Sequence, residues 1–447
     1  MANTYDRSPD EVISPASPIY MTSSMLELFA VTPPGVEALT ADELRGLGIV
    51  PVSTVRGGVT WHGSFEELYR ANLWLRTANR VIVRAASFRA TSFFELERKA
   101  KRVPWRDFIT AGRHVGFRVT CRKSRLYHHD AVAQRLAEAV APITGDQAVV
   151  GAIRGDDGEH QSDMQSGAQG QAQGDAGGEA QDGDRQHVSM PRDDASPDLQ
   201  RFIVRVDHDQ VTISTDASGE LLHRRGYRQA VAKAPMRETL AAAMLLASRW
   251  DRRLPLIDPM CGSGTIPIEA ALMARHIAPG MRRRFAFQSW PHFDAALWGR
   301  LTAEASERAL PRAPGLIRAS DRDAGAVRAA MDNAIRAGVS ADIDISQRAI
   351  SAVAPAGRWG WIVSNPPYGV RVGDPTVRNL YAQFGKVVAT NFREWHVALL
   401  SADRRLDRET QLTFDQAFET TNGGIPVRCV VGGSAPLALS DVSVDHS

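Results

Sequence analysis

Cysteines, long apolar runs and secretion signals are scarce or missing in this sequence. Among the 447 residues there are three cysteines, Cys121, Cys261 and Cys429, and their wide spacing fits neither a disulfide framework nor a CxxC zinc site. No apolar run approaches the roughly 20 residues of a membrane helix, and residues 1–24 contain no apolar core of a signal peptide. These absences predict a cytoplasmic protein with no membrane partner.

Strong compositional bias is missing as well. Hydrophobic residues make up 43% and charged residues 23% of the chain, which excludes a wholly disordered, collagen-like or coiled-coil protein. The length corresponds to about three domains at roughly 150 residues each.

Charge is nearly balanced overall, at +2, but it is unevenly distributed. Residues 98–129 contain ten Lys and Arg against one acid, whereas residues 155–200 contain eleven acids against two Arg. The basic stretch indicates a polyanion partner or, alternatively, a solvated helix face with strand ends.

Residues 25–92 predict a small α+β unit that follows a disordered N-terminus at 1–24. The apolar segment Leu26–Val31 predicts a strand, and a Pro-Pro-Gly turn and an amphipathic helix come after it. Ser64 and Glu67 form a capping-box pattern at the start of a second helix. The resulting β-α-β-β-α-β order is typical of a ferredoxin-like fold.

Residues 93–225 predict a second small α/β unit, with a basic strand, an amphipathic helix and two alternating strands around a His-Asp turn. Within it, residues 154–200 are rich in Gln, Gly, Asp and Ser and almost free of large apolar side chains. Such a segment cannot bury enough surface to fold, so we predict a disordered acidic insertion. The strands that follow it need partners that precede it, which places the insertion inside the domain.

Residues 226–435 predict a larger α/β domain, followed by a tail at 436–447. We expect its strands at 254–260, 315–323, 342–350, 359–369 and 396–403. Strands that alternate with helices in this way are typical of a doubly wound, mostly parallel, Rossmann-like sheet. Ligands bind such sheets at the carboxyl ends of the strands, near the topological switch point.

A glycine-rich turn follows the first of these strands and opens a helix. It runs Asp258-Pro259-Met260-Cys261-Gly262-Ser263-Gly264-Thr265. Glycines let the backbone approach a ligand, and the helix start offers free N–H groups. The turn is neither a P-loop nor a GxGxxG fingerprint, and a tight turn without a ligand is the alternative. Cys261 lacks a His or Asn partner arrangement, which favours a packing role over a nucleophile.

Asp321 ends the second strand, where a carboxylate can accept hydrogen bonds from both ribose hydroxyls of a nucleoside. Asp323 is predicted instead to begin the next helix. The gap between Asp258 and Asp321 exceeds the usual spacing of about 20 residues. It predicts an aromatic and basic insertion at about 276–315, which either contacts substrate or packs against the sheet.

The most specific signal is the turn Asn365-Pro366-Pro367-Tyr368 at the end of the fourth strand. A base amino group is a weak nucleophile, because its lone pair is delocalised into the ring, and it needs acceptors that orient its protons. Prolines carry no N–H, so this turn presents carbonyls without competing donors. The Asn365 oxygen and the Pro366 carbonyl can each accept a hydrogen bond from one amine N–H, while Tyr368 can stack on an extruded base.

Other candidates are weaker. The pair His128-His129 has no third ligand at useful spacing, so we predict surface histidines and no metal. Arg225 and Arg228 belong to a basic run before the last domain, which either contacts phosphate or caps helices.

The three strand-end motifs resemble those of class I S-adenosylmethionine-dependent methyltransferases, in the branch whose NPPY motif serves exocyclic amino groups. Further segments resemble the THUMP-domain RNA guanine-N2 methyltransferases: FAVTPPGVEALTADEL, YRANLWLRTANRV, SGELLHRRGYR, APMRETLAAAMLL and IDPMCGSGTIPIEAA. The resemblance extends from about 26 to 435. It implies a ferredoxin-like unit, an RNA-binding THUMP domain and a catalytic domain that methylates guanine N2 in 23S rRNA or tRNA.

The resemblance also implies roles for individual residues. The methyl donor S-adenosylmethionine would be bound by Asp258, Pro259, Cys261, Gly262, Ser263, Gly264, Thr265, Asp321, Arg322 and Asn365. The target base would be held by Asn365, Pro366, Pro367 and Tyr368. RNA would be bound by Arg118, Arg122, Lys123, Arg125, Arg225 and Arg228.

One segment departs from the family pattern. After the third strand the family usually has an acid that contacts the adenine amino group, but this chain has Gln347-Arg348-Ala349. Adenine recognition would then use backbone groups. Two alternatives remain: an amino-methyltransferase for adenine N6 or a protein glutamine amide, and a non-catalytic RNA-binding or ribosome-assembly factor. The departure favours the second alternative, and the intact turn at 365–368 opposes it.

Overall fold

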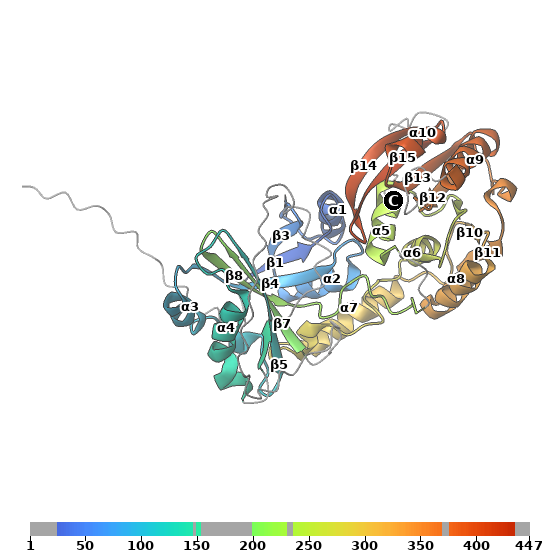
Figure 1. Ribbon diagram of the computed structural model, residues 1–447. Helices are drawn as coiled ribbons and strands as arrows, with labels where there is room; N and C mark the ends of the chain where they lie inside the picture. The colour runs from blue at the N-terminus through green and yellow to red at the C-terminus, as the bar shows by residue number, and fades with distance from the viewer. Residues whose placement is uncertain (1–24, 146–148, 153–198, 230–235, 369–374, 434–447) are drawn as a thin grey trace, which may run out of the picture.

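A computed structural model of the chain describes residues 25–145, 149–152, 199–229, 236–368 and 375–433. The segments for which we predicted disorder, 1–24 and nearly all of 154–200, lie outside the described residues, and so does the tail at 436–447. The described residues form two sheets, one of eight strands and one of seven. The N-terminal sheet and the C-terminal sheet lie side by side (Figure 1).

The N-terminal sheet has the strand order β2-β3-β1-β4-β8-β7-β5-β6. Its strands are β1 (Leu26–Val31), β2 (Val52–Val55), β3 (Gly58–Gly63), β4 (Arg80–Arg89), β5 (His114–Arg122), β6 (Val149–Ala152), β7 (Leu199–Asp207) and β8 (Gln210–Asp216). Its helices are α1 (Glu37–Gly46), α2 (Phe65–Trp74), α3 (Phe93–Ala100), the short η1 (Trp105–Asp107) and α4 (His129–Thr144). The order β1-α1-β2-β3-α2-β4 confirms the ferredoxin-like unit, and Ser64 and Glu67 form the predicted capping box of α2.

The two small N-terminal units share one continuous sheet. Antiparallel pairing of β4 with β8 joins them, from Ile82 opposite Asp216 to Arg89 opposite Gln210. Leu199 and Gln200, which we assigned to the insertion, belong instead to β7. Gln200 is fully buried, and its Oε1 accepts a hydrogen bond from the indole Nε1 of Trp290 at 2.8 Å. Gln200 is therefore held in place by a partner far along the chain, and its burial could not be predicted from its polar side chain.

The C-terminal sheet has the strand order β11-β10-β9-β12-β13-β15-β14. Its strands are β9 (Leu256–Asp258), β10 (Ile317–Asp321), β11 (Ile343–Gln347), β12 (Gly360–Ser364), β13 (Trp395–Ser401), β14 (Thr413–Asn422) and β15 (Ile425–Gly433). Strands β9 to β13 pair in parallel, and the hairpin β14–β15 adds antiparallel strands at one edge. This arrangement confirms the Rossmann-like α/β fold.

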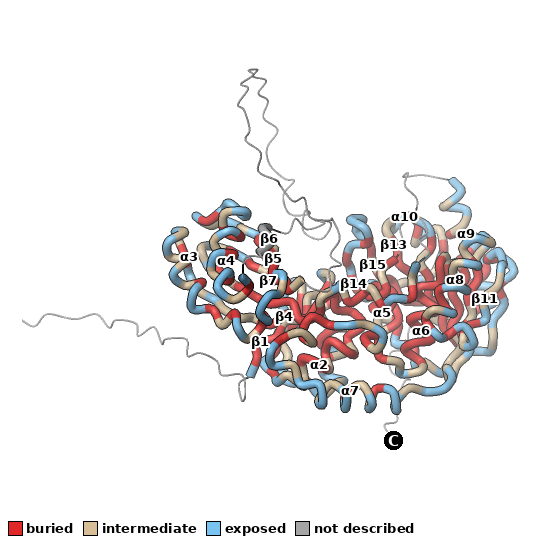
Figure 2. Tube along the Cα trace, turned by 90° about the horizontal axis from the view of Figure 1, so that it is seen from below, coloured by how far each residue is buried: buried red, intermediate tan, exposed pale blue. Residues whose placement is uncertain are grey.

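Helices cover both faces of this sheet. The helices of this half of the chain are α5 (Glu238–Ala247), α6 (Thr265–Ala274), η3 (Ala286–Ser289), α7 (Ala295–Glu307), α8 (Ala324–Ala337), η4 (Ser340–Asp342), η5 (Ile350–Ala352), α9 (Pro375–Asn391) and α10 (Arg404–Glu409), of which η3 and α7 pack elsewhere. Side chains alternate along each strand, so Trp361 and Val363 of β12 pack with α5, α6 and α8, whereas Ile362 packs with α9. Buried residues fill the interior of this half of the molecule (Figure 2). No helix in the described ranges is long and apolar enough to cross a membrane.

The predicted insertion at 276–315 contains η3 and α7. It packs against α2 of the ferredoxin-like unit, which we call the N-terminal unit. Tyr69 of α2 stacks on Phe287 with 4.4 Å between ring centroids, and Trp298 of α7 meets Tyr69 edge-on. The Gly280 N–H donates to the Leu73 carbonyl at 2.9 Å, and a side chain at Gly280 would collide with Leu73. This insertion is therefore an aromatic strap between the two sheets.

A buried charge cluster also joins the two halves. Glu269 of α6 is fully buried and accepts hydrogen bonds from Arg225 Nε at 2.9 Å and from Tyr227 Oη at 3.0 Å. Arg76, which follows α2, lies 3.9 Å from the other Glu269 oxygen, and its carbonyl accepts from Arg225 Nη2 at 2.8 Å. A buried charge is tolerated only when it is paired, so this cluster fixes α6 relative to the N-terminal sheet.

Arg225→Ala should destabilise the protein strongly, because it leaves Glu269 buried beside a single, more distant cation. Removal of one partner from a buried pair costs about 3–5 kcal/mol of unfolding free energy. Urea unfolding followed by tryptophan fluorescence measures this loss. The exposed Arg328 of α8 gives the control, Arg328→Ala, for which we expect a change within about 0.5 kcal/mol. Equal stabilities of the two variants would contradict a structural role for the cluster.

Candidate functional site

Three neighbouring parallel strands end at the same edge of the C-terminal sheet. β10 ends at Asp321, β9 at Asp258 and β12 at Ser364, and the three strands are adjacent in the order β10-β9-β12. The glycine-rich turn and the Asn-Pro-Pro-Tyr turn leave from this edge. The structure therefore brings together the two carboxylates and the turn that the sequence pattern placed at strand ends.

Asp258 is almost fully buried, with 1% of its surface exposed. Its Oδ1 accepts hydrogen bonds from Ser364 Oγ at 2.7 Å and from the Met260 N–H at 3.2 Å. Burial raises the pKa of Asp258 to about 7, with a smaller contribution from the negative charge of Asp321, while these two hydrogen bonds oppose the rise. A cation bound beside this carboxyl would favour its ionised form.

Hydrogen bonds connect the glycine-rich turn to the end of β10. The Cys261 N–H donates to the Ser320 carbonyl at 2.9 Å, and the Gly262 N–H donates to Asp321 Oδ2 at 3.0 Å. Gly262 and Gly264 have φ angles of +52° and +83°, which disfavour residues with a Cβ. Around Gly262, no described heavy atom lies within 4 Å of the place a Cβ would occupy, so its backbone faces open space.

The other residues of this turn are mostly interior. Pro259, Cys261, Ser263 and Thr265 are buried, and Asn333 of α8 donates to the Ser263 carbonyl at 2.9 Å. Burial raises the pKa of the Cys261 thiol well above its usual value, and the charges of both carboxylates add to this effect. Because a thiolate is the nucleophilic form, the structure favours the packing role of Cys261.

Asp321 uses both carboxylate oxygens in the structure. Oδ1 accepts from the Asp323 N–H at 3.0 Å, and Oδ2 accepts from Gly262. A carboxylate has about four lone-pair positions, so capacity remains for two hydroxyl donors. Asp323 caps α8 by accepting from the Gly325 N–H at 2.6 Å, as predicted, and Arg322 is exposed.

Asn365 and Tyr368 lie on the turn that follows β12. Asn365 is half-buried, and within the described part of the chain its Oδ1 is a buried acceptor without a hydrogen-bond partner. Pro366 is buried and Pro367 is exposed. The half-buried Tyr368 accepts a hydrogen bond at Oη from Asn422 Nδ2 at 2.8 Å. Buried polar atoms are nearly always hydrogen-bonded, so the free Asn365 oxygen indicates a missing donor.

The segment that departs from the family pattern lies beside Asp321. Gln347, Arg348 and Ala349 are exposed, and the Arg348 N–H donates to the Asp321 carbonyl at 3.0 Å. Gln347 Nε2 donates to the Arg322 carbonyl at 3.1 Å. The backbone of this segment thus lies next to the carboxylate assigned to the ribose, where backbone groups could meet an adenine.

The basic residues after β5 form a fixed surface turn. Arg122, Lys123 and Arg125 are exposed, and Arg118 on β5 is half-buried. The Arg125 N–H donates to Asp209 Oδ1 at 2.8 Å, and the Asp209 N–H donates to Ser124 Oγ at 2.9 Å. We call Arg122, Lys123 and Arg125 the basic turn.

The structure corrects the assignment of Arg225 to an RNA surface. Arg225 is 5% exposed and pairs with Glu269, so it acts in the interior. Arg228 is also held, because it donates to the Met236 carbonyl at 2.6 Å and pairs with Glu238 at 3.2 Å. The sequence left two interpretations of this basic run, phosphate contacts or contacts within the protein. For Arg225 and Arg228 the structure favours contacts within the protein. Charge along a sequence does not report burial, which explains the error.

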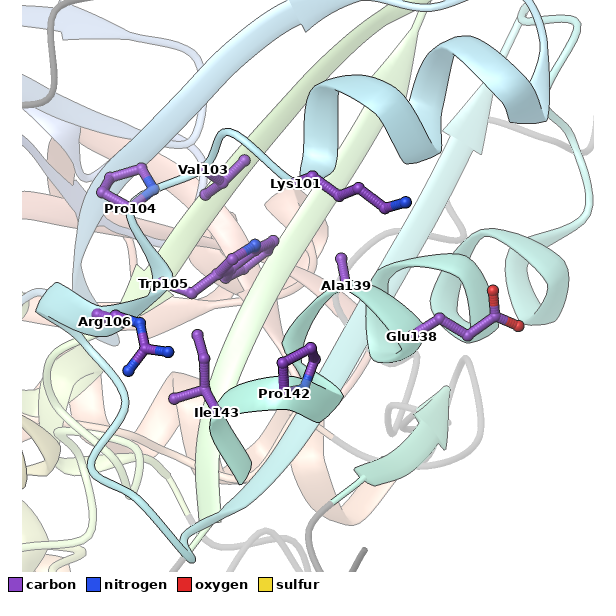
Figure 3. Close-up of a pocket in the computed structure, with 9 residues that line it drawn as sticks. All are labelled: Lys101, Val103, Pro104, Trp105, Arg106, Glu138, Ala139, Pro142 and Ile143. Atoms are coloured by element: carbon purple, nitrogen blue, oxygen red, sulfur yellow. The ribbon is translucent and has the colours of Figure 1, made fainter. Parts of the chain in front are cut away.

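A cavity of about 420 Å³ lies elsewhere, between residues 101–106 and α4 (Figure 3). Its lining includes Lys101, Trp105, Glu138 and Ile143, all from the N-terminal sheet and its helices. It is therefore distinct from the site at the strand ends. In the described segments, no group of three or more His, Cys, Asp and Glu could hold a metal ion.

Sequence reasoning missed two side chains that position this site. Ser364 carries the hydrogen bond that joins β12 to Asp258, and only its place beside Asn365 could have indicated it. Asn422 reaches Tyr368 from the hairpin β14–β15, which we did not predict. The sequence Asn422-Gly423-Gly424 between alternating segments is a two-residue hairpin signal that could have located it.

Asp258→Asn should change how stability depends on pH. The folded-state pKa of about 7 lies above the value of roughly 4 in an unfolded chain. The folded protein therefore retains a proton that the unfolded chain loses, and this carboxyl lowers the unfolding free energy as pH rises from about 4 to about 7. Asparagine keeps an acceptor oxygen but cannot ionise. The unfolding free energy of the variant, relative to that of the wild type, should therefore increase as pH rises from 5 to 8.

Urea unfolding of both proteins at the two pH values measures this gain. Asp332→Asn, an exposed position on α8, is the control and should show no such change. A stability difference between Asp258→Asn and wild type that is the same at both pH values would contradict the raised pKa.

A solved structure resembles nearly the whole chain. The crystal structure of SMU.472 in complex with SAH superposes with a TM-score of 0.75 at 27% sequence identity, covering 93% of this chain and 100% of that one. The agreement includes both sheets, because so little of either chain is left out.

Sequence comparisons agree with the structural one. The RlmL ferredoxin-like domain matches residues 27–82, and the RMKL-like methyltransferase domain matches residues 225–430. The ribosomal RNA large subunit methyltransferase K/L of Syntrophotalea carbinolica is 35% identical over 90% of this chain, which spans about half (53%) of that relative's length. The slr0064 protein of Synechocystis sp. is 31% identical over 89% of this chain and 94% of its own length. The chain therefore belongs to the family of RMKL-like methyltransferases.

Proposed function

We propose that this chain transfers a methyl group from S-adenosylmethionine to the exocyclic N2 amine of a guanine in ribosomal or transfer RNA. The observation that carries the proposal is the Asn365 carboxamide oxygen. It is a buried acceptor with no partner among the described residues, and it lies on a turn whose prolines offer no competing N–H. An amine donor is the partner that this oxygen lacks.

The chemistry requires little from the protein beyond positioning. S-adenosylmethionine supplies an electrophilic methyl carbon on a sulfonium. The amine nitrogen forms the new N–C bond as the C–S bond breaks, S-adenosylhomocysteine leaves, and the amine proton passes to water. Asn365 Oδ1 and the Pro366 carbonyl would accept hydrogen bonds from the two amine N–H groups and so turn the nitrogen lone pair toward the methyl carbon, while the Tyr368 ring would stack on the base.

The residues around the glycine-rich turn fit a methyl donor of this kind. Asp258 offers a buried carboxyl that a cationic ammonium group would ionise and bind. Gly262 leaves its backbone open to a ligand, and Asp321 retains acceptor capacity for ribose hydroxyls. S-adenosylhomocysteine in the related SMU.472 structure supports the same choice of donor.

RNA is the substrate class that the N-terminal half favours. The basic turn is exposed and held rigid by hydrogen bonds to Asp209 and Ser124, which suits phosphate contacts that position a substrate. The K/L relatives are named as ribosomal RNA methyltransferases. The unit built from β5 to β8, α3 and α4 is proposed to be the RNA-binding THUMP domain that the sequence resemblance implies.

Methyl transfer from labelled S-adenosylmethionine tests the proposal. The acceptors are total tRNA and, separately, rRNA from a strain that lacks this protein, and the product nucleosides are identified by mass spectrometry. N2-methylguanosine in one pool would support the proposal and identify the RNA. N6-methyladenosine would overturn the choice of base, and RNA binding without any transfer would favour a non-catalytic RNA-binding factor.

Asn365→Ala should lower turnover by at least about 100-fold, as is typical when an oriented hydrogen-bonding group of an active site is lost. RNA affinity should be unchanged, because the substitution leaves the phosphate contacts in place. Initial rates with RNA in excess and filter binding measure the two quantities. Asn391→Ala, an exposed position at the end of α9, is the control. Retained turnover in Asn365→Ala would overturn the role of this turn.

Neutralisation of the basic turn should weaken RNA binding and reduce its salt dependence. Each lost phosphate contact lowers the slope of log K against log salt by roughly 0.7–0.9, so Arg122→Gln, Lys123→Gln and Arg125→Gln together should flatten the slope by up to about 2–3. The control neutralises three exposed arginines at the amino edge of the C-terminal sheet: Arg253, Arg308 and Arg312. Equal slopes for the two triple variants would show that the basic turn faces away from RNA.

A further inference from the structure

The hydroxyl of Tyr368 is held by a residue from a distant part of the sheet. Asn422 is the last residue of β14 and is 8% exposed, and its Nδ2 donates to Tyr368 Oη at 2.8 Å. Its backbone is fixed as well, because Asn422 pairs with Ile425 across a two-residue turn. The turn residues Gly423 and Gly424 both have positive φ angles, +59° and +83°, as the tightest hairpin turns require.

The hairpin that carries Asn422 is anchored on both sides. β15 pairs with β13, an interior strand of the C-terminal sheet. From the other side, Val36 at the start of α1 belongs to the same apolar cluster as Phe418 and Val427 of the hairpin. Gly35 lies so close to β14 that a Cβ there would overlap the Glu419 carbonyl oxygen. Asn422 thus lies on a hairpin that is anchored in the sheet and that the N-terminal unit contacts directly.

We propose that Asn422 is a positioning residue, which holds the Tyr368 ring in the orientation needed to stack on the target base. This inference rests on the proposed function. A tyrosine side chain has several staggered rotamers, and the Tyr368 ring is only half-buried. The hydrogen bond selects one of them, which explains why the position uses the tyrosine hydroxyl rather than the ring alone.

The proposal also links the RNA-binding half to the reacting base. The hairpin contacts the N-terminal unit at Gly35 and Val36 and contacts the base-holding turn at Tyr368. A substrate bound to the N-terminal sheet would then meet an aromatic ring whose position is fixed relative to that same sheet. Such fixed geometry limits the conformational freedom that must be lost in the reactive complex.

A double-mutant cycle between Asn422→Ala and Tyr368→Phe tests the coupling. Phenylalanine keeps the ring and removes only the hydroxyl, so it gives the same loss from the other partner. Each single variant should lower kcat by roughly three- to tenfold, the range expected for one neutral hydrogen bond. Their combination should be no slower than either alone, and the dissociation constants for RNA and S-adenosylhomocysteine should not change. Effects that multiply would overturn the proposal.

Two further variants separate positioning from general damage to the hairpin. Asn422→Asp retains a side-chain oxygen that can accept from the tyrosine hydroxyl, so it should restore most of the activity that Asn422→Ala loses. Thr421→Ala, at the exposed neighbouring position of β14, should behave as wild type. A Thr421→Ala defect equal to that of Asn422→Ala would indicate that the hairpin, and not the hydrogen bond, is responsible.

A spectroscopic measurement keeps the test independent of catalysis. In protein labelled with 3-fluorotyrosine, the fluorine NMR signal that disappears in Tyr368→Phe identifies Tyr368 among the seven tyrosines. Asn422→Ala should shift and broaden that signal, and Thr421→Ala should not. If the Tyr368 signal does not move in Asn422→Ala, the positioning role is overturned whether or not methyl transfer occurs. If the signal moves in Asn422→Ala but the wild-type protein transfers no methyl group, only the proposed function is contradicted.

Discussion

The buried carboxylate of Glu269 is the constraint on which the arrangement of the two halves depends. Its charge lies in the interior, where it is tolerated only with partners, and Arg225 and Arg76 provide them. Arg76 follows the second helix of the N-terminal unit, and Glu269 lies one turn into the helix that starts at the glycine-rich turn. The cluster therefore fixes the helix that follows the glycine-rich turn relative to the N-terminal sheet.

The aromatic strap at 276–315 strengthens the same junction by different physics. Burial of apolar area and ring stacking are weakly directional, so Tyr69, Phe287 and Trp298 supply adhesion between the halves. Backbone hydrogen bonds, such as that from Gly280 to Leu73, define the register. Apolar packing by the strap holds the two sheets together, and the charge cluster sets their relative orientation. A substrate that contacts both sheets would require such a fixed arrangement.

Local sequence signals identified the strand ends, and long-range contacts decided what the signals missed. Asp258, Asp321 and Asn365 each lie at or directly after the end of a short strand pattern, so their placement could be predicted from neighbouring residues. The burial of Arg225 depends on Glu269, 44 residues away, and the role of Asn422 depends on Tyr368, 54 residues away. Neither partner is marked in the sequence near the residue it controls, and the polar Gln200 was likewise assigned to the insertion because Trp290 lies far along the chain.

The turn from Ser364 to Tyr368 is held at both ends, and this accounts for how the proposed reaction could proceed without a strong base. A hydrogen bond from Ser364 joins its start to Asp258, and a hydrogen bond from Asn422 joins its end to the hairpin against which the N-terminal unit packs. Between these anchors, the Asn365 oxygen has no hydrogen-bond partner among the residues that the structure describes. An amine whose lone pair is delocalised reacts only when its protons are held and its nitrogen faces the methyl carbon. In the proposed reaction, a turn fixed from both sides would provide that geometry before the base arrives, so the reorganisation that solution chemistry requires would already be complete in the folded protein.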